Sequence, residues 1–326
     1  MIKLAFIFPG QGSQSPGMGK DFYENIPEAR EVFDRAGEVL GWDAREICFG
    51  KETGKINLTE YTQPAILVSS VAAWETLKAA VKAAGIEMTP ACMAGHSLGE
   101  YTAWIAAGGI DYPEALSIVQ MRGRLMQQAV PEGEGLMAAI LGLEKEKVVE
   151  VCKEASLLGI VSPANYNGPS QVVIAGVRPA VEKAGELAKM RGAKRVIPLQ
   201  VSVPSHCTLM EPAAEKMREL FGGTAFRPLK TPVITNVDAR PVRSAEGIRD
   251  ALSRQLTHPV RWDESVAEMI SSGCELFVEV GPGKVLSGLV KRISETLSRP
   301  VRTVRVEDRS SLEETLSVLK ASRGGF

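Results

Sequence analysis

Hydrophobic residues along the chain form two kinds of pattern, short continuous runs and longer stretches with helical spacing. Short apolar runs predict buried strands over residues 2–8, 91–94, 232–235 and 276–280. Helical spacing predicts helices over 26–40, 64–84, 98–107 and 111–129, and after the turn at 281–283. Alternation of this kind is typical of a largely parallel sheet covered by helices, so we expect an α/β fold.

The middle of the chain has a pattern of its own. After a Pro- and Gly-containing linker at 131–135, it predicts strands over 136–142, 160–163, 171–175 and 194–199, with helices over 144–156 and 178–191. The order βαββαβ is that of the ferredoxin-like unit. We therefore expect a small ferredoxin-like domain at 132–201, inserted into a large α/β domain made of 1–131 and 202–326.

Composition and charge exclude several classes of protein. The 326 residues are 44% hydrophobic, and 38 Lys and Arg balance 39 Asp and Glu, so there is no basic footprint for nucleic acid. The first apolar run is too short for a signal peptide, and no stretch approaches the roughly 20 apolar residues of a membrane span. The five cysteines are widely spaced without a CxxC pair, which disfavours disulfides and zinc. We expect a soluble, cytoplasmic protein without membrane association.

A candidate nucleophile lies between a predicted strand and a predicted helix. Gly95-His96-Ser97-Leu98-Gly99 fits the G-x-S-x-G elbow, in which small flanking residues let a strained turn present the serine hydroxyl. Ser97 would then lie at a helix N-terminus, which favours a developing negative charge. The alternative is a tight turn whose serine only caps the helix.

A serine hydroxyl needs a base, and histidine is the side chain best matched to neutral pH. The chain has three histidines. His96 adjoins Ser97 in a turn that separates neighbouring side chains, and His258 lies in a segment without other catalytic features. His206 follows the inserted domain, where two domains would form a cleft, so elimination favours it as the base. The alternative is a satisfied histidine on a buried loop.

Several spaced motifs extend this pair into a family resemblance. They are Phe8-Pro9-Gly10-Gln11-Gly12-Ser13-Gln14, Gly95-His96-Ser97-Leu98-Gly99-Glu100, Gln120-Met121-Arg122-Gly123, Pro204-Ser205-His206-Cys207, Gln255-Leu256-Thr257-His258-Pro259-Val260-Arg261-Trp262 and Glu279-Val280-Gly281-Pro282-Gly283. In order, and over nearly the whole chain, they resemble the malonyl-CoA:acyl-carrier-protein transacylases of bacterial fatty-acid synthesis. The resemblance implies a hydrolase-like large domain with a mainly parallel sheet and a ferredoxin-like insert.

The resemblance also implies roles for individual residues. Ser97 would be the nucleophile and His206 the base, with the backbone carbonyl of Gln255 holding the imidazole ring. The backbone amides of Gln11 and Leu98 would form the oxyanion hole. No triad aspartate would then be required.

Selectivity for the acyl group would rest on Arg122, which would bind the free carboxylate of malonyl bidentately. Met126 lies one helical turn further along and would supply an apolar wall. Ser205, before the histidine, resembles the malonyl-type members of the family. Asn165 and Asn167 would reach the cleft from the insert, or serve as turn residues. Without the resemblance, Arg122 would be interpreted as a charged side chain on the solvent-exposed face of a helix.

The resemblance implies an enzyme with two substrates, malonyl-CoA and the phosphopantetheinylated acyl carrier protein, and no bound metal or redox cofactor. We expect a monomer. Three alternatives stay open: a serine hydrolase of the same fold, a polyketide-type acyltransferase, and a non-catalytic module that binds acyl-CoA or a carrier protein. A serine hydrolase would not require Arg122, and a non-catalytic module would not require Ser97 and His206. A polyketide-type acyltransferase would differ only in its carrier-protein partner.

Overall fold

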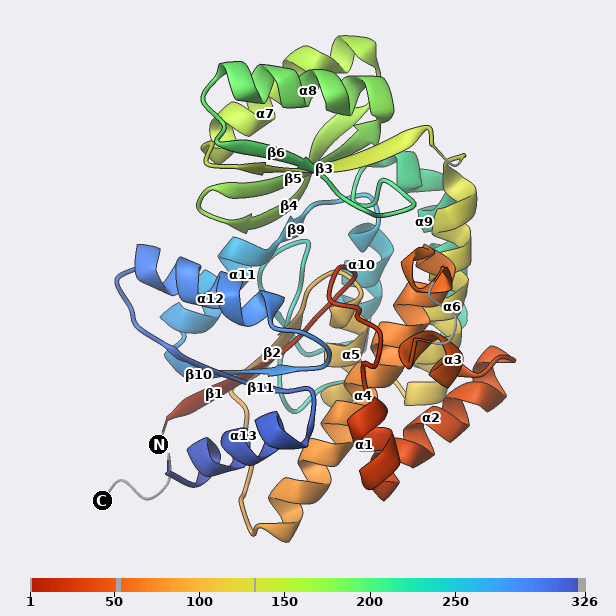
Figure 1. Cartoon of the computed structure of the whole chain (residues 1–326), viewed down its shortest axis with the longest axis vertical. Helices are drawn as coiled ribbons and strands as arrows, with labels where there is room; N and C mark the ends of the chain where they lie inside the picture. The colour runs from red at the N-terminus through yellow and green to blue at the C-terminus, as the bar shows by residue number, and fades with distance from the viewer. Residues whose placement is uncertain (1, 51–53, 132, 322–326) are drawn as a thin grey trace.

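A computed structural model describes residues 2–50, 54–131 and 133–321, and its elements form two sheets (Figure 1). The large sheet has the order β11 (Arg302–Val306), β10 (Cys274–Val280), β1 (Lys3–Phe8), β2 (Cys92–Gly95), β7 (Val233–Ile234) and β8 (Pro241–Val242). Neighbouring strands are parallel from β11 to β7, and only β8 at the edge is antiparallel. Parallel strands are buried on both faces, which explains why they appear in the sequence as continuous apolar runs.

Helices cover both faces of this sheet. They are α1 (Lys20–Asn25), α2 (Pro27–Leu40), α3 (Ala44–Cys48), α4 (Thr59–Ala83), α5 (Gly99–Ala106), α6 (Tyr112–Ala129), α9 (Glu211–Gly223), α10 (Ala245–Gln255), α11 (Trp262–Ser271), α12 (Val285–Thr296) and α13 (Arg309–Ala321), with short 3₁₀ turns at Lys55–Asn57 and Thr208–Met210. Within the described ranges, none of these helices has the length and apolar character needed to cross a bilayer.

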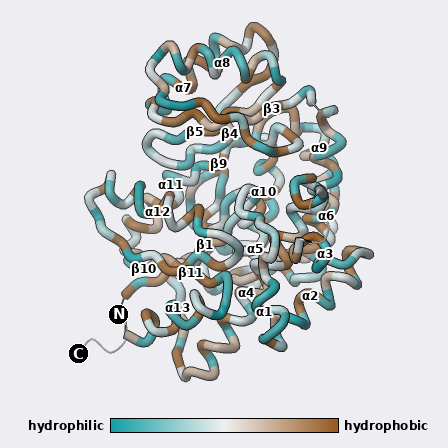
Figure 2. Tube along the Cα trace, viewed as in Figure 1, coloured by the Kyte–Doolittle hydropathy of each residue, from teal (hydrophilic) through white to brown (hydrophobic). Residues whose placement is uncertain are grey.

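The central strand β1 divides the core of the large part into two. Phe6 and Phe8 point to the face covered by α4, where their rings lie 5.0 and 5.9 Å from that of Trp74. Ala5 and Ile7 point to the opposite face and join a cluster with residues of α11 and α12. Figure 2 shows hydrophobic colour running along the interior strand β10. Because successive side chains of a strand point to opposite faces of the sheet, β1 contributes residues to both cores.

The small sheet lies above the large part in Figure 1, with α7 (Lys145–Ala155) and α8 (Arg178–Met190) on its outer face. Its order is β6 (Arg195–Pro198), β3 (Gly135–Leu141), β5 (Gln171–Val177), β4 (Val161–Gly168) and β9 (Val260–Arg261). The first four strands follow the predicted βαββαβ order and pair antiparallel. The domain limits at 132 and 201 stay a prediction, and residue 132 lies outside the described residues.

The structure contains elements that the sequence patterns did not predict, such as β8, β11, α10 and α13, and it differs from the prediction in two further details. The fifth strand, β9, belongs to a segment far from the insert and pairs parallel with β4, and a two-residue strand leaves no periodic pattern to detect. The helix predicted to begin at Pro64 begins at Thr59, with Pro64 inside it. The predicted start rested on the helical spacing of the apolar residues after Pro64, but this interior proline removes one backbone hydrogen bond without ending the helix. Buried Thr62 and Gln63 anchor the earlier turn.

Candidate active site

A strained turn between β2 and α5 presents Ser97. Its φ angle is 50°, in the left-handed region that non-glycine residues rarely adopt. A Cβ atom on Gly95 would lie 2.0 Å from the backbone of Gly99, and one on Gly99 would lie 2.1 Å from the carbonyl oxygen of Phe8. Glycine is therefore required on both sides of the serine, as the elbow predicts.

His206 lies next to this serine although 109 residues separate the two. Its Nε2 atom is 2.7 Å from the Ser97 hydroxyl oxygen, and its Nδ1 atom lies 2.9 Å from the carbonyl oxygen of Gln255 and 3.2 Å from that of His258. Two carbonyl acceptors favour the tautomer with hydrogen on Nδ1, which leaves Nε2 free to accept a proton. The carbonyl of His258 is a second acceptor that the sequence did not indicate.

The surroundings of His206 keep its ring neutral. The side chain is buried, and burial together with the positive charge of Arg122 lowers the pKa of His206 to about 3. Both effects disfavour the imidazolium form. At neutral pH the ring therefore has a lone pair facing the Ser97 hydroxyl, which is the state that a general base requires.

Arg122, on α6, is a buried cation with polar but uncharged partners. It is 1% exposed, and its Nη1 and Nη2 atoms donate to the side-chain oxygens of Gln63 at 2.5 Å and Gln255 at 3.0 Å. Nη2 lies 3.4 Å from the Ser97 hydroxyl oxygen, and Nε has no hydrogen-bond partner among the described residues. No ion pair to Arg122 occurs in the part of the chain that the structure describes. A buried guanidinium without a carboxylate is costly, so the site favours an incoming anion.

Gln11 and Leu98 are the two residues whose backbone amides the family resemblance assigns to the oxyanion hole. Both residues line the same cavity as Ser97 and His206, and Leu98 immediately precedes α5. Among the hydrogen bonds of the described residues, neither backbone N–H is used; the Gln11 side chain donates to the Thr59 hydroxyl at 3.2 Å. Two unused N–H groups beside a serine match the donor set of an oxyanion hole.

Loops and helices of the large part and two strands of the small sheet line this cavity, which encloses about 60 Å³. The lining residues are Gln11, Gln63, His96, Ser97, Leu98, Met126, Met137, Asn165, Leu199, Val201, Val203, Ser205 and His206. Met126, Asn165 and Ser205 are among these residues, and their role in substrate binding stays a prediction. Asn167 instead holds His96, with its Oδ1 2.8 Å from Nε2 of that ring, so His96 belongs to the wall.

Besides Gln63, two more buried polar residues of the site had not been singled out from the sequence. Asn236 follows β7; its Oδ1 accepts from the Ser97 amide and its Nδ2 donates to the Gly95 carbonyl, each at 2.7 Å. Glu100 lies in the first turn of α5 and accepts from Nε2 of Gln255 at 2.7 Å. A signal existed for Asn236, because it follows the strand next to β2 and the carboxyl ends of parallel strands share one edge.

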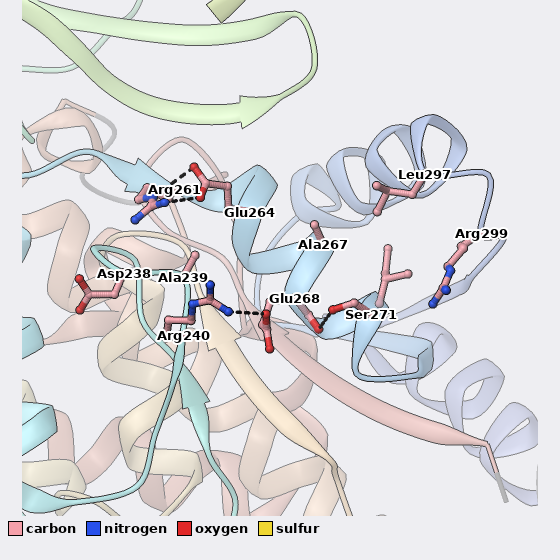
Figure 3. Close-up of a pocket in the computed structure, with 11 residues that line it drawn as sticks. Asp238, Ala239, Arg240, Arg261, Glu264, Ala267, Glu268, Ser271, Leu297 and Arg299 are labelled. Atoms are coloured by element: carbon pink, nitrogen blue, oxygen red, sulfur yellow. Dashed lines mark hydrogen bonds and ion pairs between the residues drawn. The ribbon is translucent and has the colours of Figure 1, made fainter.

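A larger cavity of about 420 Å³ lies beside α11 and contains none of the predicted site residues (Figure 3). Its wall is charged, and two of its three arginines have carboxylate partners: Arg240 lies 3.2 Å from Glu268, and Arg261 pairs with Glu264. The described residues contain no group of three or more His, Cys, Asp or Glu side chains that could hold one metal ion.

Comparison with known proteins gives one consistent family. Residues 5–311 match the acyl transferase domain family. The chain is 48% identical over 298 residues to the malonyl CoA-acyl carrier protein transacylase of Escherichia coli K12, covering 91% of this chain and 95% of that protein. It is 44% identical over 321 residues to the protein of that name from Bacillus subtilis 168, covering 98% of each.

Solved structures agree with the sequence relatives. An acyl carrier protein S-malonyltransferase from Vibrio cholerae superposes with a TM-score of 0.89 at 47% identity, covering 96% of this chain and 99% of that one. A malonyl-transacylase in complex with a type II polyketide acyl-carrier protein superposes with a TM-score of 0.91 at 46% identity, covering 97% and 99%. Similarity over whole chains at this level extends to both sheets.

Proposed function

The chain belongs to the acyl transferase domain family, and within it to the malonyl CoA-acyl carrier protein transacylases, and from this membership we propose the reaction and the role of each site residue. The protein transfers the malonyl group of malonyl-CoA to the phosphopantetheine thiol of an acyl carrier protein. The observation that carries the proposal is Arg122, a buried cation with no carboxylate in direct contact among the described residues, 3.4 Å from the Ser97 hydroxyl oxygen. An acyl group with a free carboxylate would complete this pair.

In the first half-reaction, Ser97 Oγ attacks the thioester carbonyl while its proton passes to Nε2 of His206. The resulting oxyanion accepts hydrogen bonds from the amides of Gln11 and Leu98, each worth on the order of a hundredfold in rate. When the tetrahedral intermediate collapses, the C–S bond breaks and coenzyme A leaves as a thiol with the proton from His206. The malonyl group stays on Ser97 as an ester.

In the second half-reaction, the carrier thiol gives its proton to His206 and attacks this ester. Collapse breaks the bond to Ser97 Oγ, which takes the proton back, and malonyl leaves on the carrier. His206 needs no carboxylate partner in this scheme, because the carbonyls of Gln255 and His258 orient the ring. The scheme uses protein side chains and backbone amides alone, with ping-pong kinetics.

The acyl pocket would select malonyl through one charge and one apolar wall. Arg122 binds the carboxylate, and Met126 packs beside it with its sulfur held by the Gln63 side chain at 3.3 Å. Ser205 donates to the sulfur of Met137 at 3.4 Å and keeps that side of the cavity small. Asn165 contributes the polar edge from the small sheet. We propose these four as the substrate-binding residues.

The acceptor of the acyl group separates the transferase from a serine hydrolase. The protein is loaded with malonyl-CoA, and release of malonyl is followed with water alone and with phosphopantetheinylated carrier. We expect the ester to be stable in water and to be consumed rapidly by the carrier thiol. Equal release with and without carrier would contradict transferase activity.

A polyketide-type acyltransferase is the second candidate, favoured by the similarity to a malonyl-transacylase in complex with a type II polyketide carrier. It differs in partner and not in chemistry. Transfer rates to fatty-acid and polyketide carriers would separate the two, with the higher kcat/KM identifying the natural partner. The monomeric state stays an expectation, which sedimentation of the full chain would test.

A further inference from the structure

Glu100 is a buried carboxylate linked to Arg122 through a single amide group. The Gln255 side chain donates from Nε2 to Oε2 of Glu100 at 2.7 Å and accepts at Oε1 from Nη2 of Arg122 at 3.0 Å. Glu100 and Arg122 are each 1% exposed. The backbone N–H of Asn236 donates to the same Oε2 at 3.4 Å, while Oε1 has no partner among the described residues. The side-chain amide of Gln255 thus connects the carboxylate to the guanidinium, without a direct ion pair between the two among the described residues.

The remaining charges near Glu100 are few. Asp238, after β7, is partly exposed and paired with Arg254, whose Nη2 lies 2.6 Å from its carboxylate. Tyr101 is the next residue on α5, and His206 lies beyond Gln255 and is neutral. Burial raises the pKa of Glu100 to about 7, against the opposing effects of the Gln255 and Asn236 donors and of Arg122. The carboxyl group therefore exchanges its proton near neutral pH.

A substrate carboxylate changes the charge of this cluster. In the free protein, Arg122 and ionised Glu100 sum to zero. A malonyl carboxylate on Arg122 would leave one excess negative charge in a space closed to water, where an unbalanced charge is strongly disfavoured. Protonation of Glu100 would restore neutrality without moving any backbone.

We propose that Glu100 is the resident counter-charge of Arg122 and takes up one proton from solvent when an acyl group with a carboxylate binds. This inference rests on the proposed function, because it assigns the acyl carboxylate to Arg122. Glu100 acts through Gln255 and is a positioning residue, not a catalytic one. It makes malonyl binding sensitive to pH, whereas binding of a neutral acyl group is not.

The sign of the pH effect follows from the proton balance. Above the pKa of Glu100 in the free protein, the carboxylate must take up a proton for each malonyl group that binds, and the proton concentration falls as the pH rises. The affinity for malonyl-CoA then falls by up to tenfold for each pH unit. Acetyl-CoA has the same coenzyme phosphates without the acyl carboxylate, so it serves as the matched ligand.

Titration calorimetry in buffers with different ionisation enthalpies counts the protons. We would use the full chain with Ser97→Ala, which prevents acylation, at about pH 8 and about pH 5.5. Malonyl-CoA should take up close to one proton more than acetyl-CoA at the higher pH and far less at the lower pH, where Glu100 is already protonated. Glu100→Gln should abolish the difference and flatten the pH dependence of malonyl affinity. Glu313→Gln, an exposed glutamate on α13, is the control and should change neither.

Each failure has a distinct meaning. If malonyl-CoA binds no more tightly than acetyl-CoA, the proposed function is wrong. If malonyl-CoA binds more tightly but takes up no extra proton, or if Glu100→Gln leaves the uptake intact, the function stands and the counter-charge role is overturned. A purely structural role for Glu100 would weaken both ligands equally and leave the proton count unchanged. Should Glu100→Gln fail to fold, the two-pH comparison in the Ser97→Ala protein alone decides.

Discussion

Arginine side chains lie next to both the cavity that contains Ser97 and His206 and the larger cavity beside α11. The two sets of arginines differ in how their positive charges are balanced. In the larger cavity, Arg240 and Arg261 are partly exposed and each has a glutamate partner. Beside the cavity that contains Ser97 and His206, Arg122 is buried, donates to amide and hydroxyl oxygens and lies over the ring of Tyr101. A paired surface arginine has little reason to bind an anion, whereas a buried one without a carboxylate does. A buried arginine with no carboxylate in direct contact among the described residues, and not the volume of a cavity, distinguishes the candidate substrate site.

Removing the charge of Arg122 should have the largest effect. Arg122→Ala should lower kcat/KM for malonyl-CoA by roughly 10²- to 10³-fold, because a buried carboxylate without its partner costs about 3–5 kcal/mol. The same change should leave acetyl-CoA nearly unaffected. Steady-state transfer to the carrier protein with both thioesters measures the ratio.

Arg122→Lys is the matched variant, since lysine keeps the charge but not the planar fork that binds two carboxylate oxygens. We expect it to recover only part of the malonyl rate. Equal losses with malonyl-CoA and acetyl-CoA would show that Arg122 supports the fold and not the acyl carboxylate.

A smaller effect concerns acid. Because burial and Arg122 lower the pKa of His206 to about 3, the ring should stay neutral well below the usual pKa of histidine, near 6.5. The acylation rate should therefore change little between about pH 7 and pH 5, where an ordinary histidine base would lose roughly 30-fold. Removing the positive charge in Arg122→Ala should move the acid limb to higher pH. Stopped-flow release of coenzyme A measures it, and an acid limb near pH 6.5 in the unaltered protein would contradict the assigned environment.

The smallest effect belongs to the other cavity. Arg240→Ala breaks an exposed pair with Glu268, and such pairs contribute about 0–1 kcal/mol. We expect kcat/KM for malonyl-CoA to stay within about twofold and the melting temperature to fall by a few degrees at most. A large loss of transfer activity would assign this cavity a part in substrate or carrier binding and remove the contrast with Arg122.

The sequence predicted the parts of the molecule that have a local signature. Buried parallel strands appear as apolar runs, the insert as a βαββαβ pattern, and the elbow as two glycines around Ser97 that the backbone contacts make necessary. The elimination among three histidines selected His206, the ring that lies 2.7 Å from Ser97 Oγ. The role of Arg122 came from the family resemblance, because the neighbouring sequence alone indicates a solvent-exposed arginine on a helix.

The remaining features depend on contacts between distant segments. Asn236 supports the elbow from 139 residues away, and Glu100 acquires its environment from Gln255, 155 residues further on. The strand β9 is two residues long and exists only because β4 offers an edge. No local spacing encodes such pairings, since each is set by the order of the strands and by which side chains are left to fill the cavity.

Intact-mass analysis after mixing with malonyl-CoA, without carrier protein, tests the central claim most directly. The account predicts the addition of one malonyl group, located on Ser97 by peptide mapping, and its disappearance when carrier is added. The Ser97→Ala protein should remain unmodified under the same conditions. A malonyl adduct on that variant, or none on the unaltered protein, would contradict the proposed nucleophile.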